Sequence, residues 1–277
     1  MIRAMVFSDR TLAQRLEASE GYACAQFAVA RKRLFPDCGS AWMRRAGADV
    51  VFDGMDAPTT QTFGLGISEP LTAETLNEIE EFFVQRGAVP MHEISPFAGA
   101  ETLSLLCARG YAPFEISSVL FQELSVVPAS ASASDRTQIR MIEPAESALW
   151  AAVNARGWAH EHPEFEEFLK STGELLAARE NSPCFLAQLD GTPAAAAGLC
   201  LHEGVALLAG AATVPEYRHN GLQAALLAER MRFAHNHGCD LAMIVTEAGS
   251  LSQRNAERAG FRIAYTRLKW KPVSPRT

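Results

Sequence analysis

The pattern of apolar and polar positions is clearest in the second half of the chain, where strand-like runs alternate with helical periodicity. Apolar runs at 184–189, 194–201 and 205–214 are separated by turn residues and predict a hairpin followed by a third strand. Apolar positions at helical spacing from Leu222 to Phe233 then predict a helix, and a strand follows at 241–245. A helix ending at Gly260 and a strand through Tyr265 complete the series, and two helices are expected earlier, at 143–156 and from 161 onward.

The first half repeats this order. A helical pattern at 78–85 is followed by a strand-like run at 89–94, a helix ending at 107–111 and a strand at 116–124. Gly87 and Gly110 are 23 residues apart, while Gly238 and Gly260 are 22 residues apart. We interpret this as an internal duplication. Chance is the alternative, because helix, glycine and strand recur in any α/β chain.

The stretch 127–135 separates the two halves. After Val127 it contains no large apolar side chain and alternates Ala with Ser, a composition typical of linkers. We therefore predict a first domain at 1–125, a linker at 126–137 and a second domain at 138–277. A long surface loop within one domain is the less usual alternative.

Composition narrows the possible functions. The 277 residues are 48% hydrophobic and carry a net charge of −7, with a pI near 5.6, which predicts a globular protein that does not bind nucleic acid. Residues 1–125 hold 10 basic and 16 acidic residues, so this half would attract a cationic amine. Near the C-terminus, basic residues face only Glu257 and predict a basic wall for a small polyanion: Arg254, Arg258, Arg262, Arg267, Lys269, Lys271 and Arg276.

Cysteine spacing and the N-terminus point to a cytoplasmic protein. The six cysteines form no C-x-x-C pair, and we expect buried, reduced thiols. Charged residues such as Arg10 and Glu17 interrupt any secretory signal, and no uncharged run reaches about 18 residues, so no membrane segment is predicted.

The most informative local feature is the junction Arg218-His219-Asn220-Gly221-Leu222-Gln223, which joins the strand at 205–214 to the next helix. The first turn of a helix leaves N–H groups without intrahelical partners and carries about half a positive charge. Gly221 lets a ligand approach the backbone, and Arg218 adds positive charge. This junction predicts a phosphate-binding site.

The matching place in the first half reads Ile67-Ser68-Glu69-Pro70-Leu71-Thr72. Proline removes an N–H donor and Glu69 repels a phosphate. We therefore expect no anion site at that position.

The second half resembles the GCN5-related N-acetyltransferase (GNAT) family, whose members bind acetyl-CoA at an R/Q-x-x-G-x-G/A loop before a helix. Arg218 and Gly221 match this loop, Gln223 departs from its final Gly or Ala, and Gly260-Phe261 matches a Gly-Phe segment of the family. The resemblance implies an α/β (α+β) fold with two GNAT-like domains, each a mixed, mostly antiparallel twisted sheet flanked by helices. The first domain would be a degenerate copy without the cofactor loop.

The resemblance also implies a function and a cofactor site. We expect an N-acetyltransferase that moves acetyl from acetyl-CoA to a primary amine of a small molecule by direct attack in a ternary complex. Main-chain groups of Thr213 and Val214 would pair with the pantetheine arm, and Arg254 and Asn255 would lie across the cleft. The pyrophosphate would be held by the loop residues: Arg218, His219, Asn220, Gly221, Leu222, Gln223 and Ala224.

The catalytic groups are less defined. Family members often place a proton-donating tyrosine four residues before the Gly of Gly-Phe, but Ala256 stands there. Tyr265 and Ser252 are the alternatives, with Tyr217 as a packing residue. The base is expected among the polar groups that face the cleft, which are Glu247 and the turn residues His160, Glu161 and His162. His160-Glu161-His162 is a further polar group, which we interpret as a substrate-facing loop or a helix cap rather than a metal site.

Two alternatives stay open. The lack of the usual tyrosine, and of an acid in the strand at 205–213, fits a catalytically silent acyl-CoA-binding or regulatory protein. A nucleotide enzyme finds no support in a G-x-x-x-x-G-K-S/T loop or a G-x-G-x-x-G stretch. As partners we expect a small-molecule amine, with the chain acting as a monomer or homodimer. Trp42, Phe63 and Met91 are candidates for lining an amine pocket, or else belong to the core.

Overall fold

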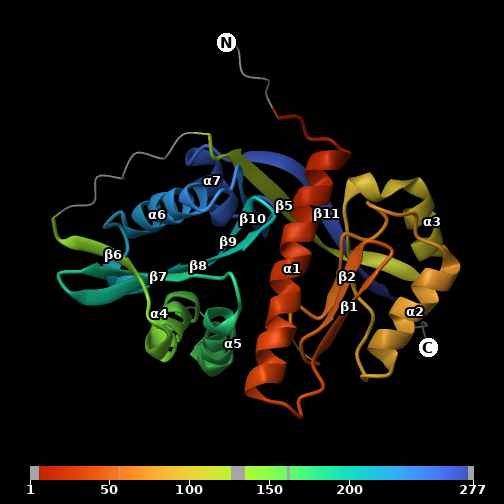
Figure 1. The fold of residues 1–277 in the computed structure, drawn as a ribbon, viewed down its shortest axis with the longest axis horizontal. Coiled ribbons are helices and arrows are strands. Elements are labelled where there is room, and N and C mark those ends of the chain that lie inside the picture. Colours follow the sequence, from red (N-terminus) through yellow and green to blue (C-terminus); the bar gives the residue numbers. More distant parts are fainter. Residues whose placement is uncertain (1–5, 56, 126–134, 161–162, 274–277) are drawn as a thin grey trace. The chain divides into compact units, whose positions relative to one another are not determined.

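A computed structural model of the chain describes residues 6–55, 57–125, 135–160 and 163–273. The chain divides into two compact units (Figure 1). Unit 1 contains Met1–Phe121 together with Val245–Thr277, and unit 2 contains Gln122–Ile244. The predicted division at 1–125 and 138–277 differs from these units, because residues 245–277 group with the first half. Most of the predicted linker lies outside the described residues.

Unit 1 is a mixed sheet with helices. Its strands lie in the order β1-β2-β3-β4-β11-β5, and the last strand of the chain therefore completes this sheet. The pairs are antiparallel except for β3 with β4, which is parallel. The strands are β1 (Ala41–Arg45), β2 (Ala48–Phe52), β3 (Gln61–Phe63), β4 (His92–Ile94), β5 (Tyr111–Glu123) and β11 (Arg262–Pro272). The helices are α1 (Arg10–Leu34), α2 (Ala73–Val84), α3 (Gly99–Ala108) and α7 (Leu251–Arg258), with a 3-10 turn at Pro96–Ala98.

Both faces of this sheet are covered, which explains why every residue of β2 is buried. Side chains alternate along a strand. Val50 packs with residues of α2 and α3, whereas Val51 and Phe63 pack with residues of α1. Helix α1 begins at Asp9, whose carboxylate accepts the Leu12 N–H at 2.8 Å, an N-cap that fixes where the helix starts.

Unit 2 repeats this pattern of connections. Its strands lie in the order β10-β9-β8-β7-β6; β9 and β10 are parallel and the other pairs are antiparallel. The strands are β6 (Thr137–Met141), β7 (Cys184–Leu189), β8 (Thr192–His202), β9 (Val205–Thr213) and β10 (Leu241–Glu247). The helices are α4 (Ser147–Trp158), α5 (Glu166–Ala178) and α6 (Leu222–Asn236), with 3-10 turns at Pro144–Glu146, Pro163–Phe165 and Pro215–Tyr217.

Small residues allow close packing in unit 2. Helices α4 and α5 lie on one face of its sheet and α6 on the other (Figure 1). Leu176 of α5 reaches both Gly198 and Gly210, where an added Cβ would come within 2.8 and 2.9 Å of its methyl groups. Strand β8 is rich in alanine and is buried from Ala194 to Cys200, as expected for a strand covered on both faces.

The predicted fold class is confirmed, with mixed, mostly antiparallel sheets flanked by helices. The elements that the sequence predicted from residue 78 onward occur in the predicted order, with ends that differ by a few residues, whereas α1, β1, β2, β3 and β6 were not predicted. The helix expected at 143–156 starts at Ser147, because Pro144 opens a separate 3-10 turn. The strand expected at 116–124 is longer and starts at Tyr111.

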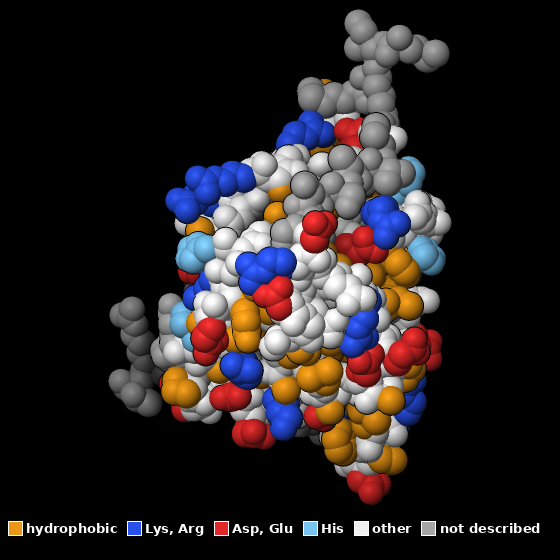
Figure 2. All heavy atoms as spheres, turned by 90° about the vertical axis from the view of Figure 1, so that its left-hand side faces the viewer, with side chains coloured by type: hydrophobic (Ala, Val, Ile, Leu, Met, Phe, Trp, Pro, Cys, Tyr) orange, Lys and Arg blue, Asp and Glu red, His pale blue; other side chains and the backbone are white. Residues whose placement is uncertain are grey.

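The described residues test two expectations from the sequence, one about the cysteines and one about membrane segments. All six cysteines are free thiols, but Cys107 is exposed and Cys38 half-buried, so burial holds for four of them. Within the described ranges, the helices are too short or too polar to cross a membrane. On the face that Figure 2 displays, basic and acidic side chains are interspersed.

Candidate functional site

The start of helix α6 is the centre of the candidate site in unit 2. Gly221 is the N-cap and adopts a left-handed conformation with φ +74°, and no side chain caps the helix. The first-turn N–H groups therefore lack the partner that a Ser, Thr, Asn or Asp cap supplies. An added Cβ at Gly221 would meet no atom within 4 Å, so the space in front of the helix is open. The geometry fits an anion held by the amides of Leu222, Gln223 and Ala224.

The loop before α6 is held by its own side chains. His219 is also left-handed, with φ +66°, an uncommon state for a residue with a Cβ. The Asn220 amide donates to the carbonyls of Tyr217 and Arg218, each at 3.1 Å. Successive N–H groups in a turn conformation can point to one side and form an anion-binding concavity. His219 and Asn220 are exposed, as a ligand-contacting loop requires.

The Arg218 side chain turns toward the protein. Its guanidinium donates to the carbonyls of Gly157 at 3.2 Å and Thr213 at 3.4 Å, and Nη1 lies 3.1 Å from Nε2 of His160. Arg218 thereby joins the end of β9, the end of α4 and the loop. Its positive charge lies near the start of α6, but its N–H groups already bind other parts of the protein and hold the loop in place.

Strand β9 pairs with β10 over only part of its length. Its register with β10 runs from Val205 to Leu207, although both strands continue. A bulge follows at Gly210, which has φ +60°, between the pairs Gly198↔Ala209 and Ala196↔Ala212. Bulges bend a strand and are frequent next to binding sites. After Leu207 the edge of β9 is no longer paired with β10, although the carbonyls of Gly210 and Thr213 accept from Asn154 and Arg218.

Thr213 and Val214 take different roles at this edge. The Val214 N–H donates to Ala194 O at 3.0 Å, so this amide is already used inside unit 2. Because backbone groups of successive strand residues face opposite sides, those of Thr213 face away from β8. The Thr213 hydroxyl donates to Oε1 of Gln223 at 3.2 Å and joins the end of β9 to the first turn of α6. Gln223, the departure from the family loop, therefore folds back and leaves its N–H free for the helix start.

Buried polar side chains that the sequence did not reveal support the bulge. Arg230 of α6 is 3% exposed and donates to the carbonyls of Gly198 at 2.9 Å, Ala209 at 3.5 Å and Leu226 at 3.2 Å. Burial lowers the pKa of Arg230 to about 10. Asn154 of α4 donates to Gly210 O at 2.5 Å. The only sequence signal was an arginine on the apolar face of a helix.

Of the predicted group His160-Glu161-His162, only His160 is among the described residues, since Glu161 and His162 lie outside them. The other predicted catalytic and wall residues lie in unit 1. Glu247 ends β10 and is exposed. Helix α7 is capped by Ser250 and packs against β5, where Ser118 Oγ lies 3.3 Å from Gln253 Oε1. Ser252, Arg254 and Asn255 are on the exposed side of α7. The structure therefore groups the loop residues 213–224 in unit 2 and places the proposed acid, base and opposite wall in unit 1.

Tyr265 is part of a buried charged cluster in unit 1. It is 7% exposed and its hydroxyl donates to Glu17 Oε1 at 2.9 Å. Burial and the neighbouring Glu17 carboxylate raise its pKa well above the usual value. A phenol in this state is a poor proton donor for a substrate, so Ser252 is left as the candidate acid.

The predicted basic wall near the C-terminus is wrong for two of its members. Arg267 is 1% exposed and its Nη1 lies 3.0 Å from Glu17 Oε1. Lys269 is paired with Glu115 at 3.2 Å. Both side chains point into an acidic environment and are not offered to a polyanion. The partners are more than 100 residues away in the sequence, which hid the pairing.

A strand edge thus leads directly to an uncapped helix start in unit 2. Such a site can pair with an extended polar chain through β9 and hold a phosphate at α6.

Comparison with known proteins finds a family match over a part of the chain that contains this site. Residues 146–261 match the family model of the acetyltransferase (GNAT) family. No curated protein matches the sequence.

Several solved structures share the fold over nearly the whole chain. A GCN5-related N-acetyltransferase from Kribbella flavida is 15% identical with a TM-score of 0.67, covering 95% of this chain and 96% of that chain. A tandem GNAT protein from the clavulanic acid biosynthesis pathway is 14% identical with a TM-score of 0.59, covering 98% of each chain. A GCN5-related N-acetyltransferase from Sphaerobacter thermophilus is 14% identical with a TM-score of 0.52 and 92% coverage of each.

Proposed function

Residues 146–261 form a domain of the acetyltransferase (GNAT) family, and from this premise we propose that the protein transfers acetyl from acetyl-CoA to a primary amine of a small molecule. One observation carries the proposal: the α6 start is uncapped and left-handed at Gly221, and it directly follows the strand that loses its β10 partner. The α6 amides of Leu222 to Ala224 hold the pyrophosphate of the coenzyme. The Thr213 edge of β9 pairs with the pantetheine arm.

The residues present fit this coenzyme. Gly221 leaves open space where the diphosphate approaches, and Gln223 keeps its side chain on Thr213. The coenzyme supplies an acetyl thioester. The chain supplies the orientation of that thioester and a proton path, since direct transfer to an amine needs a neutral nitrogen and a protonated leaving thiol.

Two exposed residues are proposed for the proton path. Glu247, at the end of β10, accepts a proton from the ammonium form of the substrate. Ser252, in the first turn of α7, donates to the departing sulfur directly or through water. The substrate amine and the oligomeric state, monomer or homodimer, belong to the same proposal. Arg254 and Asn255 form the second wall for the coenzyme.

The test is binding and turnover on the same protein. Calorimetric titration with acetyl-CoA is expected to show one site per chain, and a panel of small primary amines is expected to release free coenzyme thiol. Gly221→Ala adds a Cβ at a left-handed position facing the ligand, so we expect weaker binding by at least tenfold. Gly238→Ala is the matched control, since Gly238 is also left-handed, with φ +82°, and has open space around it. Equal binding by both variants would contradict the loop assignment.

The catalytic assignment needs its own variants. Glu247→Gln and Ser252→Ala are expected to lower kcat while leaving acetyl-CoA affinity unchanged. Normal turnover by both would reject the proposed proton path but leave the coenzyme site intact.

A catalytically silent coenzyme-binding protein is the second candidate. It is favoured by the commitment of the Tyr265 hydroxyl to Glu17 and by Ala256, which is buried at the place of the usual tyrosine. Tight acetyl-CoA binding without thiol release from any amine would select this function.

A further inference from the structure

Among the described residues of unit 1, buried carboxyl groups outnumber buried basic side chains. One guanidinium, that of Arg267, faces three carboxylates: Nη1 lies 3.0 Å from Glu17 Oε1, Nη2 lies 2.7 Å from Glu20 Oε2, and Nη2 contacts Glu93. Burial raises the pKa of Glu17 although Arg267 lowers it. Lys269 adds a weaker contact, 3.8 Å from Glu93, and also pairs with Glu115. Such an arrangement favours a further cation.

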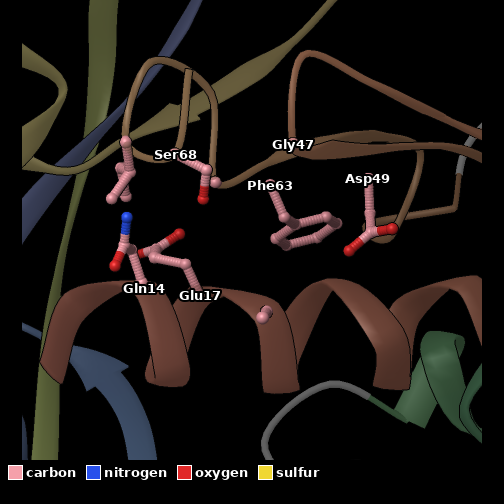
Figure 3. A pocket seen from close by; sticks show the side chains of 9 residues that line it. Gln14, Glu17, Gly47, Asp49, Phe63 and Ser68 are labelled. Atoms are coloured by element: carbon pink, nitrogen blue, oxygen red, sulfur yellow. The ribbon is translucent and has the colours of Figure 1, made fainter. Parts of the chain in front are cut away.

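One oxygen of this cluster is free and faces a pocket. Glu17 is 2% exposed; its Oε1 binds Arg267 and Tyr265, whereas its Oε2 has no hydrogen-bond partner. Glu17 and Gln14 stand on the side of α1 that faces the loop containing Ser68 (Figure 3). A buried carboxylate oxygen without a donor is costly, so an N–H donor at this point would be stabilised.

The pocket is built from α1, β2, β3 and two loops. Including its open mouth it has a volume of about 220 Å³, and its enclosed part has room for roughly one water-sized group. The half-buried or exposed residues Gln14, Gly47 and Ser68 are at the mouth, while Glu17, Asp49 and Phe63 are buried. The lining is Gln14, Glu17, Ala18, Gly47, Asp49, Phe63, Gly64, Ile67 and Ser68.

Glycines make space for the polar side chains of this pocket. A Cβ at Gly21 would lie 2.4 Å from Asp49 Oδ2, and one at Gly47 would lie 2.6 Å from the Ser68 Cβ. These distances are shorter than a Cβ tolerates, so any larger residue would displace Asp49 or Ser68.

Asp49 supplies a second buried carboxylate with little compensation. It is 5% exposed, and the nearest cation is the exposed Arg44, with Nε 3.9 Å from Oδ1. Burial raises the pKa of Asp49 to about 6. The ring of Phe63, its register partner on β3, lies between Asp49 and Glu17 in Figure 3. An aromatic face adds attraction for a cation.

We propose that this pocket binds the primary ammonium group of a small aliphatic amine. The nitrogen binds the free Oε2 of Glu17, with Gln14 and Ser68 as neutral acceptors at the mouth. Asp49 adds negative potential, and Phe63 contacts the ammonium or its first methylene group. A primary ammonium is compact and carries three donors, whereas a planar guanidinium exceeds the enclosed space. The site goes beyond the proposed acetyl transfer, because every residue named belongs to unit 1.

The test measures amine binding to the full chain without coenzyme, so its outcome is independent of acetyl transfer. Calorimetry or ligand-observed NMR with n-butylammonium chloride is expected to show saturable binding at one site, and 1-butanol, a neutral analogue of similar length, is expected not to bind. Absence of saturable n-butylammonium binding would overturn the proposal. Equal binding of 1-butanol, or displacement of n-butylammonium by millimolar Mg²⁺, would overturn the ammonium assignment.

Variants locate the site. Glu17→Gln is expected to weaken n-butylammonium binding at least tenfold. Because Glu17 is buried against Arg267, Ala18→Leu provides a second route: it fills the pocket from α1 without changing its charge, and should abolish binding. Ala100→Leu, on the exposed side of α3, is the matched control and should bind like the wild type. Unchanged binding by a folded Ala18→Leu variant would place the amine elsewhere and reject the site.

Discussion

The starts of helices α2 and α6 show how the same order of strand, loop and helix serves two purposes. Helix α6 starts at the left-handed Gly221 and has no side-chain cap. Helix α2 starts at Thr72, whose hydroxyl accepts the Thr75 N–H at 3.2 Å. Glu74 lies in the first turn of α2, where a backbone N–H and Thr72 lower its pKa. One helix start is therefore open to an external anion, and the other is satisfied by its own side chains.

The buried arginines of the two units have different kinds of partner. The buried Arg230 of unit 2 donates to main-chain carbonyls, while the buried Arg267 of unit 1 faces carboxylates. Unit 2 thus surrounds its buried guanidinium with neutral acceptors. Unit 1 keeps negative charge in its interior, next to a pocket. The difference suggests that a repeated fold retains its packing while its polar groups are reassigned, one copy for anions and the other for cations.

The largest expected effect concerns the two buried arginines. Arg267→Gln leaves Glu17, Glu20 and Glu93 without their shared cation, and should lower the free energy of unfolding by about 3–5 kcal/mol. Arg230→Gln removes donors only from neutral carbonyls and should cost about 1–3 kcal/mol. Urea denaturation followed by circular dichroism measures both variants. A larger loss for Arg230→Gln than for Arg267→Gln would contradict the contrast between the two interiors.

The second prediction gives the first turn of α6 an acidic residue, as the first turn of α2 has in unit 1. Gln223→Glu places a carboxylate in the first turn, as Glu74 does in α2, and still offers an oxygen to the Thr213 hydroxyl. The helix dipole tolerates this charge, so folding should be unaffected. Acetyl-CoA affinity should fall about 30-fold, or ~2 kcal/mol, through repulsion of the diphosphate.

Calorimetry with acetyl-CoA checks this result. Gln138→Glu, on the exposed strand β6, changes the net charge equally and should bind normally. Unaltered affinity in Gln223→Glu would mean that the first turn of α6 does not face the diphosphate.

The third prediction concerns how far the buried Asp49 of the unit 1 pocket lowers the free energy of unfolding. The pKa of Asp49 is raised to about 6 from an ordinary 3.8, so the folded state holds more protons between these pH values than the unfolded state. Stability should therefore fall as pH rises from about 4 to 6 and remain lower above. Asp49→Asn should raise the free energy of unfolding at pH 7.5 by roughly 1–2 kcal/mol. The pKa change alone, at ~1.4 kcal/mol per pKa unit, implies a larger gain, but the new amide is also buried and this reduces the gain.

Thermal or urea unfolding at pH 7.5 and pH 4 tests the sign. The gain from Asp49→Asn should shrink toward pH 4, where Asp49 is protonated in the folded state. Asp37→Asn, in the exposed loop after α1, makes the same change in charge and should be nearly neutral. A destabilising effect at pH 7.5 would show that Asp49 has a favourable partner in solution.

Sequence reasoning succeeded where signals were local. The start of α6 was predicted because Gly221 and the apolar periodicity after it are adjacent in the chain, and the order of strands followed from turn residues. The position of β11 in unit 1 was not predicted, since its alternating pattern suits either sheet equally well. Arg267 was misread as a surface charge because Glu17 is 250 residues away. Residues two apart in a strand, such as Arg267 and Lys269, share a face, but this spacing does not reveal what the face contacts.

The smallest expected effect tests whether the unit 1 helix start can be opened. Thr72→Ala removes the cap of α2 and should lower the free energy of unfolding by about 1 kcal/mol, the usual cost of losing a threonine N-cap. Thr172→Ala, which removes a hydroxyl from within α5, should be neutral or slightly stabilising, because alanine favours a helix interior. Opening the cap should still not create a coenzyme site, because Pro70 lacks an N–H and both Glu69 and Glu74 repel a diphosphate. Calorimetry should therefore show one acetyl-CoA per chain in the wild type and in Thr72→Ala. A second equivalent bound by the variant would mean that the cap alone separates the two copies, and that the surrounding charges count for less than the comparison of α2 and α6 implies.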